Sequence, residues 1–312
     1  MKPIRWIAFL ILVVTAGPAP AAEPLTVMLD WFVNPDHAPL LIAQDKGFFA
    51  GRGLDVNLVA PSNPNDPPKL VAAGKADLAV SYQPQLYLFA DQGLPVVRIA
   101  TLVATPLNCL VALADGPVKT LADIKGRTIG YSIGGFETVL LSTMLATAGL
   151  KPEDVTLVSV QFALSQSLLS GKVQAVIGAF RNFELNQLAI EGRPARAFFV
   201  EEHGVPAYDE LIVIAHRDKL ADKRLRPFIE AIEQGVQYLV NHPQESWQTI
   251  VKTRKDLDNE LNRRAFADTL PRLALRPGAL DNARYRRFGE FCKQKEMIKT
   301  LPPLERLAVE LP

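Results

Sequence analysis

Two stretches of the sequence decide the fold: residues 53–80, GLDVNLVAPSNPNDPPKLVAAGKADLAV, and residues 149–178, GLKPEDVTLVSVQFALSQSLLSGKVQAVIG. Each begins with a glycine and a short apolar run, continues to a second glycine followed by lysine, and ends in another apolar run. The two glycines are 21 positions apart in the first stretch and 22 apart in the second. This match predicts that the chain contains the same strand-helix-strand unit twice.

Flanking apolar runs extend each copy to a larger α/β unit. A strand over residues 25–29 and a helix over residues 39–49 precede the first stretch. In the second copy, a strand over residues 127–131 and a helix ending at residue 148 occupy the same places. Strands that alternate with helices are expected to pair in parallel through right-handed crossovers. The sequence therefore predicts an α/β fold made of two related lobes.

Length and composition agree with two lobes. At 312 residues the chain exceeds what one hydrophobic core usually supports, and 48% hydrophobic with 21% charged residues is typical of a folded chain. Residues 102–113 are expected to cross from the first lobe to the second, and residues 210–216 are expected to form a strand that leads back. The predicted division is lobe 1 at residues 22–106 and 213–312, and lobe 2 at residues 107–212.

The first 21 residues have the features of a cleavable secretory signal peptide. Lys2 and Arg5 precede an apolar stretch over residues 6–16, and residues 19–21 form a small-residue A-x-A cleavage site. This stretch is too short to span a hydrocarbon core of about 30 Å, so no stable membrane insertion is expected after cleavage. An uncleaved anchor is the alternative. The mature protein is expected to be a monomer in the periplasm.

Charge and cysteine content exclude several classes of function. With 34 basic and 33 acidic residues the net charge is +1, and losing the two basic residues of the signal changes it to −1. No broad positive field is left for nucleic acid or an anionic membrane. Cys109, Cys292 and the four histidines lack metal-binding or redox spacing, so no metal and no cofactor is expected. The two cysteines are expected to be buried thiols, with a disulfide as the alternative.

A ligand is expected at the turns that follow the strands, because open α/β sheets bind ligands beyond the carboxyl ends of their strands. Two facing lobes would bring these turns to one cleft. The turns are rich in aromatic, amide and acidic side chains, which can stack on a flat ring and form hydrogen bonds with it. The candidate ligand-binding residues are Asp30, Trp31, Asn34, His37, Ser81, Tyr82, Gln83, Asn108, Ser132, Gly134, Gly135, Phe136, Glu137, Phe180, Asn182 and Glu184.

Several candidates also have a structural interpretation. Trp31 could close the end of the core instead of stacking on a ligand, and His37 could bond a loop carbonyl. Glu137 lies in the first turn of a predicted helix, where the helix dipole favours a carboxylate without any ligand. The glycine pair that opens this helix could leave backbone N–H groups free for an anion. Arg181, the one cation in these turns, could bind a ligand or form a salt bridge.

Residues 30–40 (DWFVNPDHAPL) and 43–49 (AQDKGFF) resemble the opening of periplasmic binding proteins in the thiamine-pyrimidine branch of the ABC uptake family. Residues 74–80 (GKADLAV) and 121–130 (LADIKGRTIG) resemble motifs of the wider family, whose members also take up sulfonates, nitrate and other small solutes. The resemblance implies a type II periplasmic-binding-protein fold with two α/β lobes and a central cleft. It implies that the lobes close over a hydroxymethylpyrimidine or formylaminopyrimidine precursor of thiamine and deliver this aminopyrimidine to an ABC permease and its ATPase.

The resemblance also implies roles for two candidates. In that family an aromatic residue of the first turn stacks on the ring and an acidic residue pairs with the exocyclic amine. By position these roles fall on Trp31 and Glu184. A binding protein for another solute, such as a sulfonate, nitrate, an aromatic acid or a flavin precursor, is the alternative. A sulfonate would be expected to meet more cations than Arg181 alone.

A further alternative is an enzyme, because the same family contains fungal pyrimidine synthases. His37 lies in the turn that matches theirs. Those synthases carry a cysteine-rich motif, whereas this chain has only Cys109 and Cys292 and begins with a secretory signal. The sequence also lacks a Ser-His-Asp order, a Cys-His pair and a phosphate-binding loop. No catalytic residue is therefore assigned, and no enzyme activity is expected.

Overall fold

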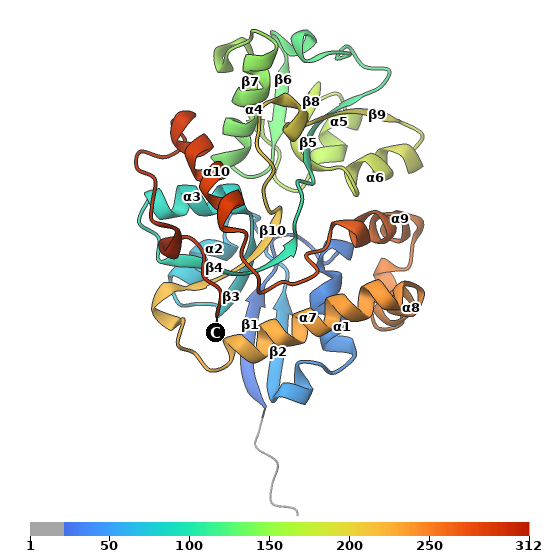
Figure 1. The fold of residues 1–312 in the computed structure, drawn as a ribbon. Helices are drawn as coiled ribbons and strands as arrows, with labels where there is room; N and C mark the ends of the chain where they lie inside the picture. Colours follow the sequence, from blue (N-terminus) through green and yellow to red (C-terminus); the bar gives the residue numbers. More distant parts are fainter. Residues whose placement is uncertain (1–21, 312) are drawn as a thin grey trace, which may run out of the picture.

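The computed structural model describes residues 22–311, so the predicted signal peptide lies outside the described residues. Figure 1 shows two lobes, one above the other, each built on its own five-stranded sheet with helices packed around it. The chain passes between the lobes twice, after β4 and before β10. None of the helices in residues 22–311 is both long enough and apolar enough to span a membrane.

The first sheet has the strand order β2-β1-β3-β10-β4. Its first three strands pair in parallel, as the alternation of strands and helices predicts, and β10 pairs antiparallel with both β3 and β4. The elements of this lobe are β1 (Glu23–Met28), α1 (Ala38–Asp45), β2 (Leu54–Val59), α2 (Pro67–Ala72), β3 (Leu78–Ser81), α3 (Gln83–Asp91), β4 (Val96–Val103), β10 (Leu211–His216), α7 (Leu225–Asn241), α8 (Pro243–Thr253), α9 (Glu260–Thr269) and α10 (Asn282–Gln294).

The second sheet repeats this arrangement with the order β7-β6-β8-β5-β9. β6 pairs in parallel with β7 and β8, and β5 pairs antiparallel with β8 and β9. Its elements are β5 (Asn108–Leu113), β6 (Thr128–Tyr131), α4 (Phe136–Thr147), β7 (Thr156–Ser159), α5 (Leu164–Leu169), β8 (Ala175–Phe180), α6 (Glu184–Ile190) and β9 (Ala195–Phe199). In each sheet the antiparallel strand follows a crossing from the other lobe. The two sheets therefore match strand for strand.

The crossings lie close to the predicted lobe boundaries. The boundary expected after residue 106 falls in the chain between β4 and β5. The boundary expected after residue 212 falls inside β10, because Leu211 and Ile212 already pair with β4 of the first sheet. The return crossing therefore ends before residue 211. The division into lobes at single-residue level stays a prediction.

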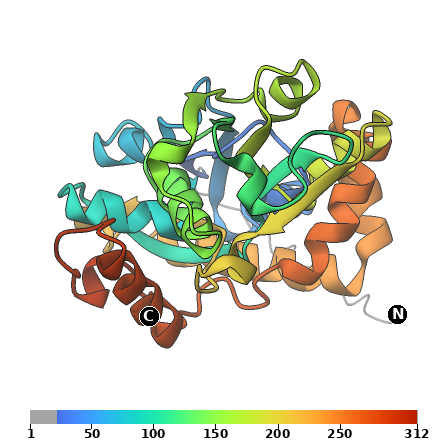
Figure 2. The ribbon, with the colours of Figure 1, turned by 90° about the horizontal axis from the view of Figure 1, so that it is seen from above.

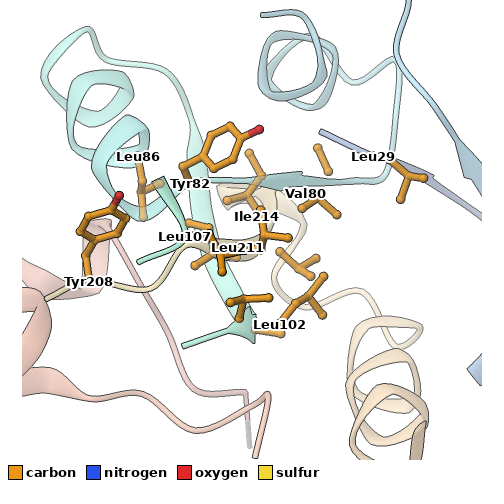
Figure 3. Packing of buried hydrophobic residues seen from close by; sticks show 14 of the residues in the cluster. Leu29, Val80, Tyr82, Leu86, Leu102, Leu107, Tyr208, Leu211 and Ile214 are labelled. Atoms are coloured by element: carbon orange, nitrogen blue, oxygen red, sulfur yellow. The ribbon is translucent and has the colours of Figure 1, made fainter. Parts of the chain in front are cut away.

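An apolar core lies directly beneath the junction of the lobes. Figure 3 shows Leu102, Leu107 and Leu211 packed together below Tyr82, whose hydroxyl points away from them. All four side chains are buried. Because they come from strand ends and from the first crossing, close packing at this place fixes where the turns of the first lobe lie.

The C-terminal helices pack around the first lobe. Figures 1 and 2 show α10 beside α3 on one side of the molecule and α8 and α9 on the opposite side. α7 packs along α1, with Phe228, Ile232 and Val236 fully buried, whereas Val240 at its end is exposed. α9 contacts both α6 and the 3-10 turn at Pro35–His37, so it touches both lobes.

The cysteines carry no bridge. Cys109 on β5 and Cys292 on α10 are both free and buried, which confirms the expectation of two buried thiols. Burial raises the pKa of both thiols well above the usual range, which keeps them unreactive. Within residues 22–311 no group of three or more His, Cys, Asp or Glu side chains is arranged to hold a metal ion.

Candidate ligand-binding cleft

A pocket lies where the strand ends of the two sheets face each other. It holds about 430 Å³ of unfilled space, including the part open to solvent. The described residues that line it are Asp30, Trp31, Asn34, Asp36 and Tyr82 from the first lobe and Ser132, Ile133, Phe136, Glu137, Leu164, Gly178, Phe180, Phe183 and Glu184 from the second. A ligand in this pocket would therefore touch both lobes.

Some of the candidates predicted from the sequence do not reach the pocket. Those that do not line it are His37, Ser81, Gln83, Asn108, Gly134, Gly135 and Asn182. Gln83 Oε1 accepts the N–H of Asp209 at 2.7 Å, and Asn108 Oδ1 accepts the N–H of Gly178 at 3.1 Å. These amides hold the crossings and strand ends in place beneath the pocket.

Asp30 is the centre of a buried hydrogen-bond chain in the first turn. Its Oδ1 lies 2.8 Å from His37 Nε2, and its Oδ2 accepts the Tyr82 hydroxyl at 2.7 Å. His37 Nδ1 accepts the N–H of Asn34 at 3.3 Å, which leaves the ring hydrogen on Nε2, facing Asp30. Burial and the Asp30 carboxylate raise the pKa of Tyr82 well above its usual value, so the phenol stays a donor. Asp30 thus orients Tyr82, with both of its oxygens occupied.

The rest of the first turn is held by amide and acid side chains. Asn34 Oδ1 accepts the N–H of Asp36 at 2.8 Å, and its Nδ2 donates to the Phe32 carbonyl at 3.2 Å, so both ends of the amide are used within the turn. Asp36, which was not among the candidates, accepts Asn182 Nδ2 at 2.5 Å and the Thr269 hydroxyl at 2.7 Å on its Oδ1. Asp36 therefore joins the first turn to the second lobe and to the end of α9.

Aromatic side chains from both lobes meet at the pocket. The Trp31 ring centroid lies 4.5 Å from that of Phe162 with the planes at 69°, and the Tyr82 centroid lies 5.4 Å from that of Phe136. Trp31 is only partly buried and lines the pocket. Phe162, in the loop after β7, was not anticipated because nothing in its local sequence marks it as facing another lobe.

Glu137 folds back over the turn that precedes its helix. Its Oε2 accepts the N–H groups of Ser132 at 2.8 Å and Ile133 at 3.1 Å. Gly178 makes room for the carboxyl, because its φ is +96° and a Cβ at this position would stand 2.5 Å from Glu137 Oε1. The helix dipole suits a carboxylate here, but the two backbone donors are what hold the Glu137 side chain.

Glu184 repeats this arrangement at the first turn of α6. Its Oε2 accepts the N–H of Phe180 at 2.7 Å. The other oxygens, Glu137 Oε1 and Glu184 Oε1, have no hydrogen-bond partner within residues 22–311, and both side chains line the pocket. The Ser132 hydroxyl, on a residue that also lines the pocket, is buried without a partner among the described residues. The second lobe therefore presents unused polar atoms to a ligand.

The pocket is acidic. Asp30, Asp36, Glu137 and Glu184 line it, and none of its described lining residues is Lys or Arg. Burial raises the pKa of Asp36 to about 6, that of Glu184 to about 7 and that of Glu137 to about 8. At neutral pH some of these carboxyls keep a proton and can donate as well as accept. Such a lining favours a neutral or cationic ligand over an anion.

Neither of the predicted anion contacts reaches the pocket. Arg181 Nη1 and Nη2 donate to Glu201 at 2.7 and 2.8 Å, and the guanidinium lies 4.1 Å from the Phe199 ring centroid. The salt-bridge interpretation of Arg181 is therefore confirmed. The N–H of Gly134 donates to Asn65 Oδ1 of the first lobe at 3.3 Å, so this backbone donor is not free for an anion.

The raised carboxyl pKa values predict that the ligand-free protein loses stability as the pH rises. The folded state keeps protons on Asp36, Glu137 and Glu184 at pH values where the unfolded chain has released them. The protons on these three carboxyls therefore stabilise the folded state most below the ordinary carboxyl pKa of about 4.5. This stabilisation is lost as the pH rises through 6 to 8. Differential scanning calorimetry should give a lower Tm at pH 8.5 than at pH 5.5. Glu137→Gln should reduce this decrease, and an unchanged decrease in that variant would contradict the assignment.

The architecture matches solved periplasmic binding proteins. The alkanesulfonate-binding protein SsuA from Xanthomonas axonopodis pv. citri matches with a TM-score of 0.71 at 16% identity, covering 93% of this chain and 97% of that chain. This likeness concerns the fold alone. Together with the two matched sheets and the pocket between them, it defines the class: a two-lobe α/β protein with the type II periplasmic-binding-protein fold.

Sequence comparisons assign the chain to one family within this class. Residues 34–246 match the family described as NMT1/THI5 like, and the chain belongs to that family. A Haemophilus influenzae protein named for thiamine biosynthesis is 50% identical over 309 residues, which cover 99% of this chain and 98% of that protein. The formylaminopyrimidine-binding protein of Halalkalibacterium halodurans is 36% identical over 258 residues, covering 82% and 78%. A 4-amino-5-hydroxymethyl-2-methylpyrimidine phosphate synthase of Saccharomyces cerevisiae is 28% identical over 258 residues, covering 79% and 76%.

Proposed function

We propose that this protein is a periplasmic solute-binding protein that captures an aminopyrimidine precursor of thiamine and delivers it to an ABC permease and its ATPase. The ligand would be a hydroxymethylpyrimidine or a formylaminopyrimidine. The observation that carries the proposal is the pocket lining, in which aromatic rings surround acidic side chains and none of the described residues is Lys or Arg. A flat ring with N–H donors and ring-nitrogen acceptors is complementary to such a lining. The 36% identity with a formylaminopyrimidine-binding protein supports the same ligand class.

Two residues have named roles in this proposal. Trp31 stacks on one face of the ring, and Glu184 accepts an N–H of the exocyclic amine. The proposal is supported by the partial exposure of Trp31 at the pocket and by the unused Oε1 of Glu184, which has no partner within residues 22–311. Trp31 belongs to the first lobe and Glu184 to the second, so ligand contacts would form on both sides of the cleft.

Capture would work by closure of the lobes. A ligand that contacts both lobes stabilises the closed form more than the open form, which shifts the population toward closure. The hinge would lie in the two crossings, which are bonded to each other. Glu210 Oε2, just before β10, accepts the N–H groups of Leu107 at 2.6 Å and Asn108 at 2.8 Å.

We propose binding without chemical conversion. The yeast relative is named as a synthase, and the histidine of the first turn is the residue of this chain to consider for a catalytic role. In this chain His37 is fully buried, does not line the pocket, and has both ring nitrogens engaged by Asp30 and Asn34. These contacts give His37 a role in holding the first turn.

Titration calorimetry of refolded, ligand-free protein tests the proposed ligand class. We expect one-to-one binding of 4-amino-5-hydroxymethyl-2-methylpyrimidine and no heat with an alkanesulfonate. Arg181→Ala should leave the pyrimidine affinity unchanged, because its guanidinium is paired with Glu201 away from the pocket. Loss of binding in that variant, or binding of the sulfonate, would favour an anion-binding protein instead.

A further inference from the structure

The acidic side chains of the pocket differ in which oxygen is free. Both oxygens of Asp30 are occupied, by His37 and Tyr82. Glu137 and Glu184 each have one oxygen held by backbone N–H groups and one without a partner within residues 22–311. In both glutamates the pocket-facing atom is therefore fixed, because the held oxygen cannot turn away without losing its backbone donors.

The two glutamates lie at neighbouring strand ends. β6 and β8 pair in parallel, with Tyr131 opposite Ile177, and Glu137 and Glu184 open the helices that follow these strands. Their carboxyls are close enough that the charge of Glu184 helps to raise the pKa of Glu137. The two carboxyls can therefore form hydrogen bonds with adjacent atoms on one edge of a ring.

Only one of the two carboxyls is expected to be ionised near neutral pH. The other ionisable groups named around them add no positive charge: Glu210 acts on Glu137, Asp36 acts on Glu184, and Tyr82 lies near Glu137 from the first lobe. Glu137 is less exposed than Glu184 and has two carboxyl neighbours, Glu184 and Glu210, whose charges disfavour its own, so Glu137 is the one of the pair that keeps its proton.

The hydrogen-bond pattern fixes where this proton sits. Oε2 of Glu137 already accepts two backbone N–H groups, so the hydrogen is carried by Oε1. Glu137 then presents an O–H donor to the pocket, whereas Glu184 presents a bare carboxylate oxygen. A donor beside an acceptor is complementary to a ring nitrogen beside an exocyclic amine.

We infer that Glu137 is the hydrogen-bond donor and Glu184 the acceptor that together select a heterocycle with a ring nitrogen next to an exocyclic amine. This inference rests on the proposed function and adds which edge of the aminopyrimidine is read. A pyrimidinone has the reversed edge, with a ring N–H beside a carbonyl. It would set donor against donor and acceptor against acceptor, which the pocket should reject.

The fixed geometry allows opposite predictions for two conservative variants. In Glu137→Gln the amide oxygen must accept the backbone N–H groups, so the NH₂ faces the pocket and the donor is kept. In Glu184→Gln the same constraint turns the NH₂ into the place of the acceptor. Calorimetry with 4-amino-5-hydroxymethyl-2-methylpyrimidine should give an affinity within about threefold of wild type for Glu137→Gln and at least about tenfold weaker for Glu184→Gln. Glu191→Gln, at the exposed far end of α6, is the matched control and should match wild type.

A second probe separates this inference from the proposed function. 5-Hydroxymethyl-2-methylpyrimidin-4-one should bind wild type at least about tenfold more weakly than the amine, and Glu184→Gln should narrow that gap. Equal losses in Glu137→Gln and Glu184→Gln, or wild-type affinity in both, would overturn the inference while leaving the aminopyrimidine ligand in place. If wild type binds neither ring, the inference and the proposed function both fail. Thermal melting of each variant checks that it is folded.

Discussion

Replacing Trp31 by alanine is expected to weaken aminopyrimidine binding by about 10- to 100-fold. Stacking of a ring on an aromatic side chain is worth about 1–3 kcal/mol, and each 1.4 kcal/mol is a factor of ten in affinity. Trp31 also packs edge-on against Phe162 of the second lobe, with ring centroids 4.5 Å apart. Its loss therefore removes a contact that favours the closed form, which acts in the same direction as the loss of stacking.

Two further variants make the Trp31 result interpretable. Trp31→Phe keeps an aromatic face and should recover most of the affinity measured by calorimetry. Trp247→Ala removes a tryptophan that packs on Phe266 at 5.3 Å and does not line the pocket, so it should leave the affinity unchanged. Wild-type affinity in Trp31→Ala would show that the ring does not stack on this residue.

Replacing Arg98 by alanine is expected to cause the largest loss of stability of any single substitution considered. Arg98, on β4, is fully buried, and its guanidinium donates to the Thr101 hydroxyl and to backbone carbonyls of residues 277–279 and Val309. These bonds attach the C-terminal tail to the first sheet. Alanine would leave buried acceptors without donors, at a cost of about 3 kcal/mol, which corresponds to a decrease in Tm of roughly 6–12 °C.

Two further variants serve as comparisons for the Arg98 prediction, one with an intermediate Tm expected and one with almost no change in Tm expected. Arg98→Lys keeps the charge but has fewer donors and cannot form the planar fork, so its Tm should fall between wild type and alanine. Arg226→Ala removes an exposed pair with Glu230 on α7 and should change the Tm very little. A Tm for Arg98→Ala within about a degree of wild type would mean that the C-terminal tail adds little to the stability of the first lobe.

The sequence pattern predicted the repeated units, but it did not predict how the remaining strands join the two sheets. Glycines after helices and short apolar runs predicted β1 to β3 and β6 to β8 correctly, because turn residues and periodicity are local features. β5 lies in the predicted crossing at residues 102–113, and β10 lies in the predicted return strand at residues 210–216. Which sheet they enter depends on pairing with strands distant in the sequence, such as Val103 with Leu211. Local sequence does not encode that choice.

Local sequence also does not determine the geometry of the candidate site. The pocket lies at turns that follow the strands, but the direction of each side chain depends on partners far along the chain. Arg181 turns away because Glu201 pairs with it, and Gly134 is bonded to Asn65 of the other lobe. Gly178 matters because the Glu137 carboxyl from another helix needs its space, a requirement that no pattern around residue 178 contains.

The central claim is that the pocket between the lobes selects an aminopyrimidine. Its most direct test is a pair of calorimetric titrations of the same refolded, ligand-free protein, one with 4-amino-5-hydroxymethyl-2-methylpyrimidine and one with an alkanesulfonate. Saturable one-to-one heat with the pyrimidine and none with the sulfonate is the predicted result. Heat with the sulfonate and none with the pyrimidine would contradict the claim.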